Sequence, residues 1–135
     1  MASGATSLLT PGAPALTPGS NQITVSWDAV TGATSYEIWY GINNISALAQ
    51  KFTGTIADNN CIITGLLSGT TYYVWIKAKN DKETSNFGSV SYCATLLDAP
   101  NMPALVPGIN QLSVSWNSVM SATSYEVWYS SSSNY

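Results

Sequence analysis

Hydrophobic and polar residues alternate in short runs along most of this chain. The alternation has a period of two in four clear segments, residues 21–27, 35–40, 71–79 and 89–95. Clusters of Pro, Gly, Asn and Asp separate these runs and favour turns between them. No segment has a convincing helical period. The pattern therefore predicts short antiparallel strands, seven in one unit, packed as a β-sandwich.

The chain also contains an internal repeat with an offset of 89 residues. Residues 14–40 align with residues 103–129, and 18 of these 27 positions are identical. This period is too long for a solenoid unit, whose repeats run to about 20–50 residues. It fits a tandem array of independently folding domains.

The repeat register divides the chain into three parts. We expect residues 1–9 to be the end of a preceding repeat or an added leader, because Leu8 aligns with Leu97. Residues 10–97 form one complete unit. Residues 98–135 open a second unit, of which we expect only the first three strands, A, B and C. The chain thus has the organisation of a window from a longer array.

Three groups of residues carry a family resemblance. Trp27, the run YEIWY at residues 36–40 and the segment ITGLLSGTTYYVWIKAKN at residues 63–80 resemble the corresponding parts of a fibronectin type III domain. The resemblance implies an immunoglobulin-like antiparallel sandwich of seven strands. It also implies that Leu66 precedes a short turn and that Tyr72 is a tyrosine-corner residue, whose hydroxyl bonds to the backbone a few residues upstream.

Period-two alternation sorts the side chains into an inner and an outer set. Strands C, F and G are neighbours in this fold, so their outward residues should gather on one face. An outer face with two Trp and two Tyr is unusual, because large exposed apolar patches usually mark contact sites. The expected inner residues are Ile23, Val25, Trp27, Tyr36, Ile38, Tyr40, Tyr72, Val74, Ile76 and Ala78. The expected outer residues are Trp39, Tyr73, Trp75 and Tyr92, together with Glu37 and Lys77.

Three interpretations of this outer face remain open. Cross-strand aromatic pairs stabilise a sheet by roughly 0.2–1 kcal/mol each, with no further role. The face could instead contact a neighbouring module or another copy of the chain. It could also stack on the sugar rings of a glycan, with Glu37, Lys77 and nearby loop Ser and Asn side chains as the available polar groups.

The second unit should expose its core residues, because the strands that would cover them are absent from the sequence. An uncovered apolar set with an unpaired strand edge favours self-association. We therefore expect a homo-oligomer, most simply a dimer, held largely by residues 98–135. The candidate residues are Leu112, Val114 and Trp116 on strand B, and Tyr125, Val127 and Tyr129 on strand C.

Composition and charge narrow the classes of partner. Only 8% of residues are charged, the formal net charge is −3, and the chain has neither Arg nor His. A basic footprint for phosphates is missing, so we expect no nucleic-acid partner. No apolar run approaches the roughly 20 residues of a membrane span. The richness in Ser, Thr, Asn and Gly is common in secreted and surface β proteins, so we expect an extracellular or cell-surface location, although residues 1–12 do not form a signal peptide.

The two cysteines, Cys61 and Cys93, raise the question of a disulfide. In the family that the chain resembles, their strands lie toward opposite edges of different sheets. Their Cα separation should then exceed the bridging limit of about 7 Å. This favours two free, inward-facing thiols that act as small hydrophobic groups.

No catalytic, cofactor or metal motif is recognisable. Without His, there is no Ser-His-Asp or Cys-His arrangement and no His-bearing metal site. The seven acidic residues are scattered, and none has the spacing of a calcium loop. We therefore expect no enzyme activity, no cofactor and no metal. The resemblance implies a structural or adhesive extracellular module that mediates protein contact or domain spacing. The alternative is a carbohydrate-binding module that uses the aromatic face of strands C, F and G.

Overall fold

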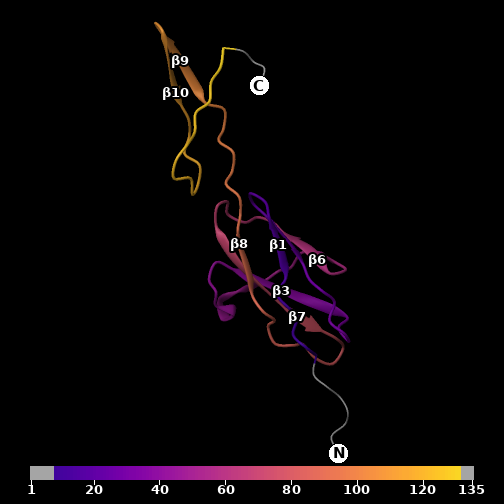
Figure 1. Ribbon diagram of the computed structural model, residues 1–135. Helices are drawn as coiled ribbons and strands as arrows, with labels where there is room; N and C mark the ends of the chain where they lie inside the picture. The colour runs from indigo at the N-terminus through magenta and orange to yellow at the C-terminus, as the bar shows by residue number, and fades with distance from the viewer. Residues whose placement is uncertain (1–7, 132–135) are drawn as a thin grey trace, which may run out of the picture.

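The computed structural model describes residues 8–131, in which a two-sheet domain, the unit expected to be complete, is followed by a separate hairpin in the segment of the second sequence repeat (Figure 1). Two four-stranded antiparallel sheets make up the domain. The first has the strand order β1 (Ala15–Pro18), β2 (Ile23–Ser26), β6 (Asn60–Ile63), β5 (Ile56–Ala57). The second has the order β4 (Gln50–Lys51), β3 (Ser35–Gly41), β7 (Thr71–Lys79), β8 (Ser91–Ala94). A single 3-10 turn, η1 (Ser46–Leu48), precedes β4.

The core lies between the two sheets and confirms the predicted alternation. In β2, Ile23 and Val25 are fully buried, and Ile38 of β3 lies opposite Ile76 of β7 with both side chains inaccessible to solvent. Tyr36, Tyr40 and Cys93 are only partly buried, but they pack against the same core. Strands β2, β3 and β7 therefore contribute alternate residues to one apolar layer, to which β1, β5, β6 and β8 add further side chains.

The tyrosine corner is present where the sequence predicts it. The Leu67 backbone N–H donates a hydrogen bond to the Tyr72 hydroxyl, with 3.0 Å between nitrogen and oxygen. Leu66 and Tyr72 are both buried, as is Trp27, which directly follows β2. Leu66 and Tyr72 anchor the turn before β7 to the core. The buried positions of all three residues agree with the structural role expected for them.

The domain has eight strands instead of the expected seven. The additional strand is β5, which pairs with β6 through Ile56 and Cys61. A tight turn joins the two strands, with Asp58 in the left-handed region at φ 52°. A pair this short gives no period-two pattern, so the sequence contains no signal for it.

Up to residue 131, the second repeat forms two strands, β9 (Ala104–Gly108) and β10 (Gln111–Ser115), paired as an antiparallel hairpin. The expected strand C, with Tyr125, Val127 and Tyr129, is wrong, since residues 122–130 form no strand. The physical reason is the lack of a partner. The equivalent β3 bonds to β7 along its whole length, and residues 8–131 contain no second copy of β7.

The expectation for residues 1–9 can be followed only from Leu8, because residues 1–7 lie outside the described part of the chain. The Leu8 backbone N–H donates to Glu83 Oε2 at 3.2 Å, which places it beside the loop between β7 and β8. Residues 132–135 of the second repeat likewise lie outside the described residues.

Candidate functional site

The predicted outer face lies on the sheet β4-β3-β7-β8. Antiparallel pairing places Trp39 directly opposite Trp75, and Tyr73 opposite Tyr92. On the same two strands, Glu37 lies opposite Lys77, two residues from the Trp39–Trp75 pair. All six predicted residues are therefore brought together on one face.

Trp75 lies on this outer face, yet its side chain is only 5% exposed. The residue that sequence reasoning missed is Phe87, from the loop between β7 and β8. Its ring lies 5.7 Å from Trp39 in an edge-on arrangement at 88°, and 6.3 Å from Trp75. The expectation of an exposed Trp75 is therefore wrong, because neighbouring rings cover it. Phe87 sits in an irregular loop where no period assigns it to a face.

The aromatic rings mostly face one another. Tyr73 stacks on Trp75 with centroids 6.5 Å apart and planes inclined by 29°, and it lies 5.5 Å from Tyr92. Offset and edge-on contacts of this kind contribute roughly 0.5–1.5 kcal/mol beyond area burial. Tyr92, at 67% exposure, is the ring in this group most accessible to a partner. The arrangement can stabilise the sheet and leaves one ring available for contact.

Glu37 is the charged centre of the face. Its carboxylate lies 3.4 Å from the Lys51 ammonium and 3.3 Å from that of Lys79, and it accepts a hydrogen bond from Trp39 Nε1 at 3.0 Å. Burial alone would raise the pKa of Glu37. The Trp39 hydrogen bond and the two ammonium groups outweigh burial, so the pKa lies below its ordinary value of 4.5. Glu37 is therefore ionised at neutral pH and helps fix the Trp39 ring.

Lys77 also belongs to the aromatic group. Its ammonium lies 4.2 Å from the Phe87 ring centroid and 5.5 Å from that of Trp39. A cation over ring faces is attracted by roughly 0.5–1 kcal/mol at exposed sites. Lys77 thus occupies ring surface that a sugar would need for stacking, and it favours the sheet-stabilising interpretation of the face.

Both cysteines are free thiols. Cys61 in β6 and Cys93 in β8 belong to different sheets, as the family resemblance implies. Burial raises the pKa of Cys61 to about 11 and also raises that of Cys93. Neither thiol is a ready nucleophile, since the thiolate is the reactive form.

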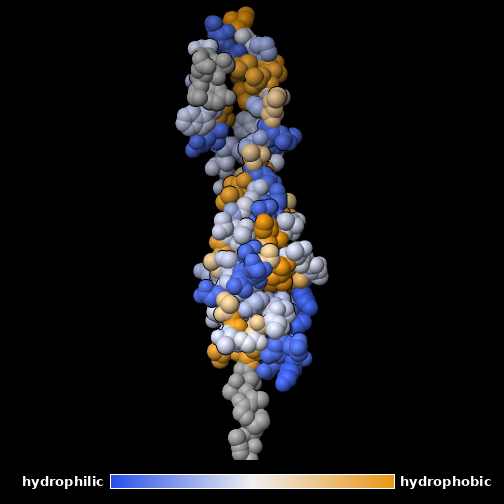
Figure 2. Space-filling model, turned by 90° about the vertical axis from the view of Figure 1, so that its right-hand side faces the viewer, coloured by the Kyte–Doolittle hydropathy of each residue, from blue (hydrophilic) through white to orange (hydrophobic). Residues whose placement is uncertain are grey.

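Five of the six predicted self-association residues of the second repeat are exposed, and Val114 is partly buried. Leu112 is 51% exposed, whereas its counterpart Ile23 is fully buried. Figure 2 shows apolar side chains gathered at the upper end of the molecule, over this repeat. The other large exposed members of the predicted set are Trp116, Tyr125, Val127 and Tyr129, and sequence reasoning missed the exposed Leu105, Val106, Ile109 and Trp128.

Within residues 8–131, no group of three or more Cys, Asp or Glu side chains is placed to hold a metal ion. None of the helical segments in that range is long and apolar enough to cross a membrane.

Comparison with known proteins identifies related chains. A family model for the fibronectin type III domain matches residues 11–92. Fibronectin type III domain-containing protein 7 of Mus musculus is 32% identical over 108 residues, which covers 80% of this chain and 14% of the mouse protein. Chitinase A1 of Niallia circulans is 32% identical over 126 residues, which covers 81% of this chain and 17% of the chitinase. The chain thus spans less than a fifth of either relative.

Two solved structures share the fold. The fn3 domain of human contactin 1 superposes with a TM-score of 0.61 at 18% identity, covering 76% of this chain and 91% of that one. An Fn3-like protein from Clostridium thermocellum gives a TM-score of 0.58 at 19% identity, covering 64% and 92% of the two chains. Together with the sandwich topology and the tyrosine corner, these matches show that the chain belongs to the fibronectin type III family.

Proposed function

We propose that this chain is a non-catalytic, extracellular module that spaces and contacts neighbouring modules of a multi-repeat protein. The family generally supplies non-catalytic modules. A spacing role requires a rigid domain that is followed by another module, and it does not require a ligand-binding cleft. The described residues offer a flat sheet face and an end-to-end arrangement of repeats, which suit contact and spacing.

One observation carries this proposal, the continuity from the first repeat to the second. The second repeat begins at the same register, and its Val119 N–H donates to the Tyr125 hydroxyl at 2.8 Å. In the complete domain, Val30 and Tyr36 form the same bond at 2.8 Å. A local fold that is repeated after a short linker is typical of modules arranged in series.

Small-angle X-ray scattering of the chain, extrapolated to zero concentration, tests the spacing role. The proposal predicts an elongated particle with the two repeats end to end, as in Figure 1. A compact particle, in which residues 104–129 fold back against the complete domain, would contradict it. A version ending at Leu97 supplies the reference curve for the complete domain alone.

Contact with a second copy is the other part of the proposal. In a domain swap, residues 104–129 of one chain would replace residues 15–40 in the sandwich of another chain. The swap would bury the apolar side chains of residues 104–129 but expose those of residues 15–40, so it yields no net burial. Direct pairing of two second repeats does bury new surface, and burial is worth about 25 cal/mol per Å² of apolar area. We therefore infer that residues 98–135 of two copies pack face to face, including Leu112, Val114, Trp116, Tyr125, Val127 and Tyr129.

A second candidate function is carbohydrate binding through the outer face of β3, β7 and β8. The observation that favours it is the relative named Chitinase A1, which acts on a polysaccharide according to its name. Tyr92 provides an exposed ring, and Glu37 and Lys77 provide polar groups on the same face. The mutual contacts of Trp39, Tyr73 and Trp75 leave less ring surface for sugars, so this role is ranked second.

Titration of tryptophan fluorescence with soluble chitin oligosaccharides tests the second candidate. If the face binds sugar, the parent chain gives a saturable change and Tyr92→Ala abolishes it. The control is Tyr129→Ala, which removes an even more exposed ring outside this face and should leave binding intact. The absence of any change in the parent chain would eliminate these sugars as ligands of the face.

A further inference from the structure

The turn before β7 touches the second repeat directly. Gly69 in this turn has φ 57°, and a Cβ placed on it would lie 2.6 Å from the Ser121 Cβ and 2.7 Å from the Leu97 Cδ2. Side-chain atoms do not approach a Cβ this closely without displacement. A residue without a side chain is therefore required at position 69 for Leu97 and Ser121 to close on the turn.

This turn is held rigidly, because the segment after β8 forms hydrogen bonds to residues on both sides of Gly69. Thr95 is 3% exposed; its hydroxyl donates to the Leu67 carbonyl at 2.6 Å and accepts from the Thr70 N–H at 3.0 Å. The Thr95 N–H donates to the Thr70 carbonyl at 2.9 Å, and the Gly69 N–H donates to the Leu96 carbonyl at 3.1 Å. The contact surface at Gly69 is thus fixed to the body of the domain.

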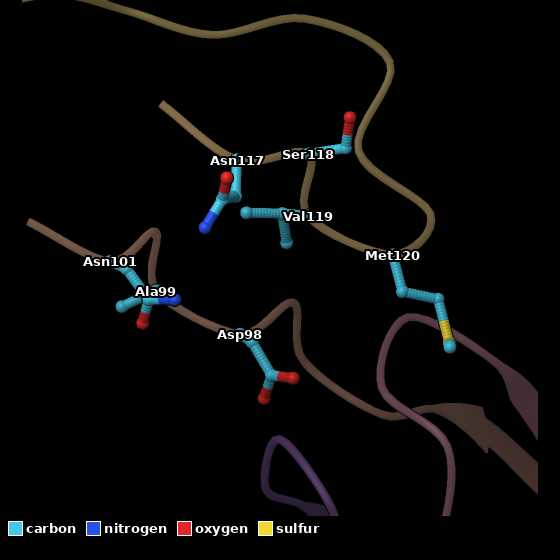
Figure 3. Close-up of a pocket in the computed structure, with 7 residues that line it drawn as sticks. All are labelled: Asp98, Ala99, Asn101, Asn117, Ser118, Val119 and Met120. Atoms are coloured by element: carbon cyan, nitrogen blue, oxygen red, sulfur yellow. The ribbon is translucent and has the colours of Figure 1, made fainter. Parts of the chain in front are cut away.

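Elsewhere the linker and the second repeat leave space between them. Asp98, Ala99 and Asn101 face residues 117–120 across an open cavity of about 360 Å³ (Figure 3). Because this region is not filled by side chains, it restrains the second repeat little. The close approach at Gly69 is therefore a candidate for the contact that sets the orientation of the second repeat.

The part of this contact that involves a leucine and a left-handed turn residue also occurs at the other end of the complete domain. Gly32 aligns with Ser121 in the repeat register, and both have positive φ, 88° and 70°. The Leu8 Cδ2 lies 3.4 Å from the place of a Cβ on Gly32, and Leu8 aligns with Leu97. A leucine beside the turn after strand B is thus common to both repeats.

We propose that residues 67–70 and Leu97 form a socket that receives the turn around Ser121 and holds consecutive modules at a fixed orientation. The partner of this surface is another fibronectin type III module with a left-handed residue at the position of Ser121. In the same register, Gly32 is the residue of the complete domain that would enter the socket of such a module, and Leu8 takes the place of Leu97 beside it. This proposal deepens the spacing role above and rests on it.

Gly69→Ala in the full chain tests the socket, and Gly65→Ala is its matched control. Gly65 also has positive φ, 72°, but a Cβ on it meets nothing within 4 Å. Both variants therefore carry the backbone strain of a left-handed alanine, and only Gly69→Ala obstructs the contact. Leu97→Ala is a second variant that leaves the turn backbone intact, with the similarly exposed Leu96→Ala as its control.

The measurement is a set of amide residual dipolar couplings from β2, β3 and β7 and from β9 and β10, recorded on dilute monomer. One alignment tensor should fit both repeats in the parent chain and in the Gly65→Ala and Leu96→Ala controls. Two tensors should be needed for Gly69→Ala and Leu97→Ala. If Gly69→Ala does not fold, Leu97→Ala against Leu96→Ala decides.

Three results would overturn the socket. The parent chain could need two alignment tensors, or a single tensor could fit both repeats in Gly69→Ala and in Leu97→Ala. The controls Gly65→Ala and Leu96→Ala could also need two tensors, as the test variants do. Each of these can coexist with an elongated scattering curve, in which case the spacing role stands without the socket. A compact scattering curve would instead remove the spacing role itself.

Discussion

The indole of Trp116 and the ring of Tyr125 lie 5.5 Å apart at an angle of 63°, although both side chains are exposed to solvent. Trp27 and Tyr36 have almost the same arrangement in the complete domain, at 5.4 Å and 64°. The end of strand B and the start of segment C therefore form a local unit that does not need the second sheet. What the second sheet adds is burial, and this difference has measurable consequences.

Removal of the two tryptophans should affect stability very differently. Trp27 is 7% exposed, so Trp27→Ala should cost about 3–5 kcal/mol through lost burial and a cavity. Trp116 is 38% exposed, and Trp116→Ala should leave the melting temperature of the complete domain nearly unchanged. Thermal denaturation followed by circular dichroism compares them. Equal destabilisation would mean that the second repeat is packed as a true core.

The tyrosine corner allows a similar comparison. Tyr72→Phe leaves the Leu67 N–H without its acceptor in a partly buried position, at an expected cost of about 1–3 kcal/mol. For a domain of this size, each kcal/mol lowers the melting temperature by roughly 4–8 °C. Tyr125→Phe removes a bond of the same kind, from a backbone N–H to a tyrosine hydroxyl, at an exposed position and should change little. An unchanged melting temperature for Tyr72→Phe would show that this bond does not support the turn.

The sequence identifies the core of the complete domain because antiparallel strands impose a period of two on every buried position. Ile23, Ile38 and Ile76 could be placed for this reason, and Tyr72 followed from its motif. The burial of Trp75 could not be predicted, because it depends on Phe87 in a loop without periodicity. A strand C that includes Tyr125, Val127 and Tyr129 was expected from the repeat register, but strand formation requires a bonding partner that the described residues lack.

The contact between Gly69 and Ser121 was equally beyond sequence reasoning. It joins a turn of one repeat to a turn of the next, and no local pattern relates the two. The repeat register shows only that Ser121 replaces Gly32. The left-handed backbone at both positions becomes apparent only in three dimensions.

Acidification should destabilise the domain through Glu37. Its folded-state pKa lies below the ordinary value of 4.5, so the stabilisation is present above that value and is lost as the pH falls through the folded pKa. Glu37→Gln should lower the melting temperature at pH 7 and flatten its fall toward pH 3. Glu126→Gln is the control, because Glu126 makes the same bond to a tryptophan but is exposed. A parent-like pH profile in Glu37→Gln would refute this role.

The two thiols should differ in reactivity. Cys61 is buried with a pKa of about 11, whereas Cys93 is half-buried, so a thiol reagent should modify Cys93 first and Cys61 only slowly in the folded chain. Both should react fully in denaturant. Mass spectrometry of the unreduced monomer should find two free thiols, and a mass lower by two hydrogens would contradict their placement in different sheets.

Contact through the second repeat is tested most directly by size-exclusion chromatography with light scattering. The full chain and a version ending at Leu97 would be compared over a wide concentration range. We predict that the full chain forms a concentration-dependent dimer or larger oligomer, and that the shorter version remains monomeric. The dimer should weaken in Val127→Asp, which places a charge on the open apolar surface. A full chain that stays monomeric at the highest concentration would contradict contact through residues 98–135.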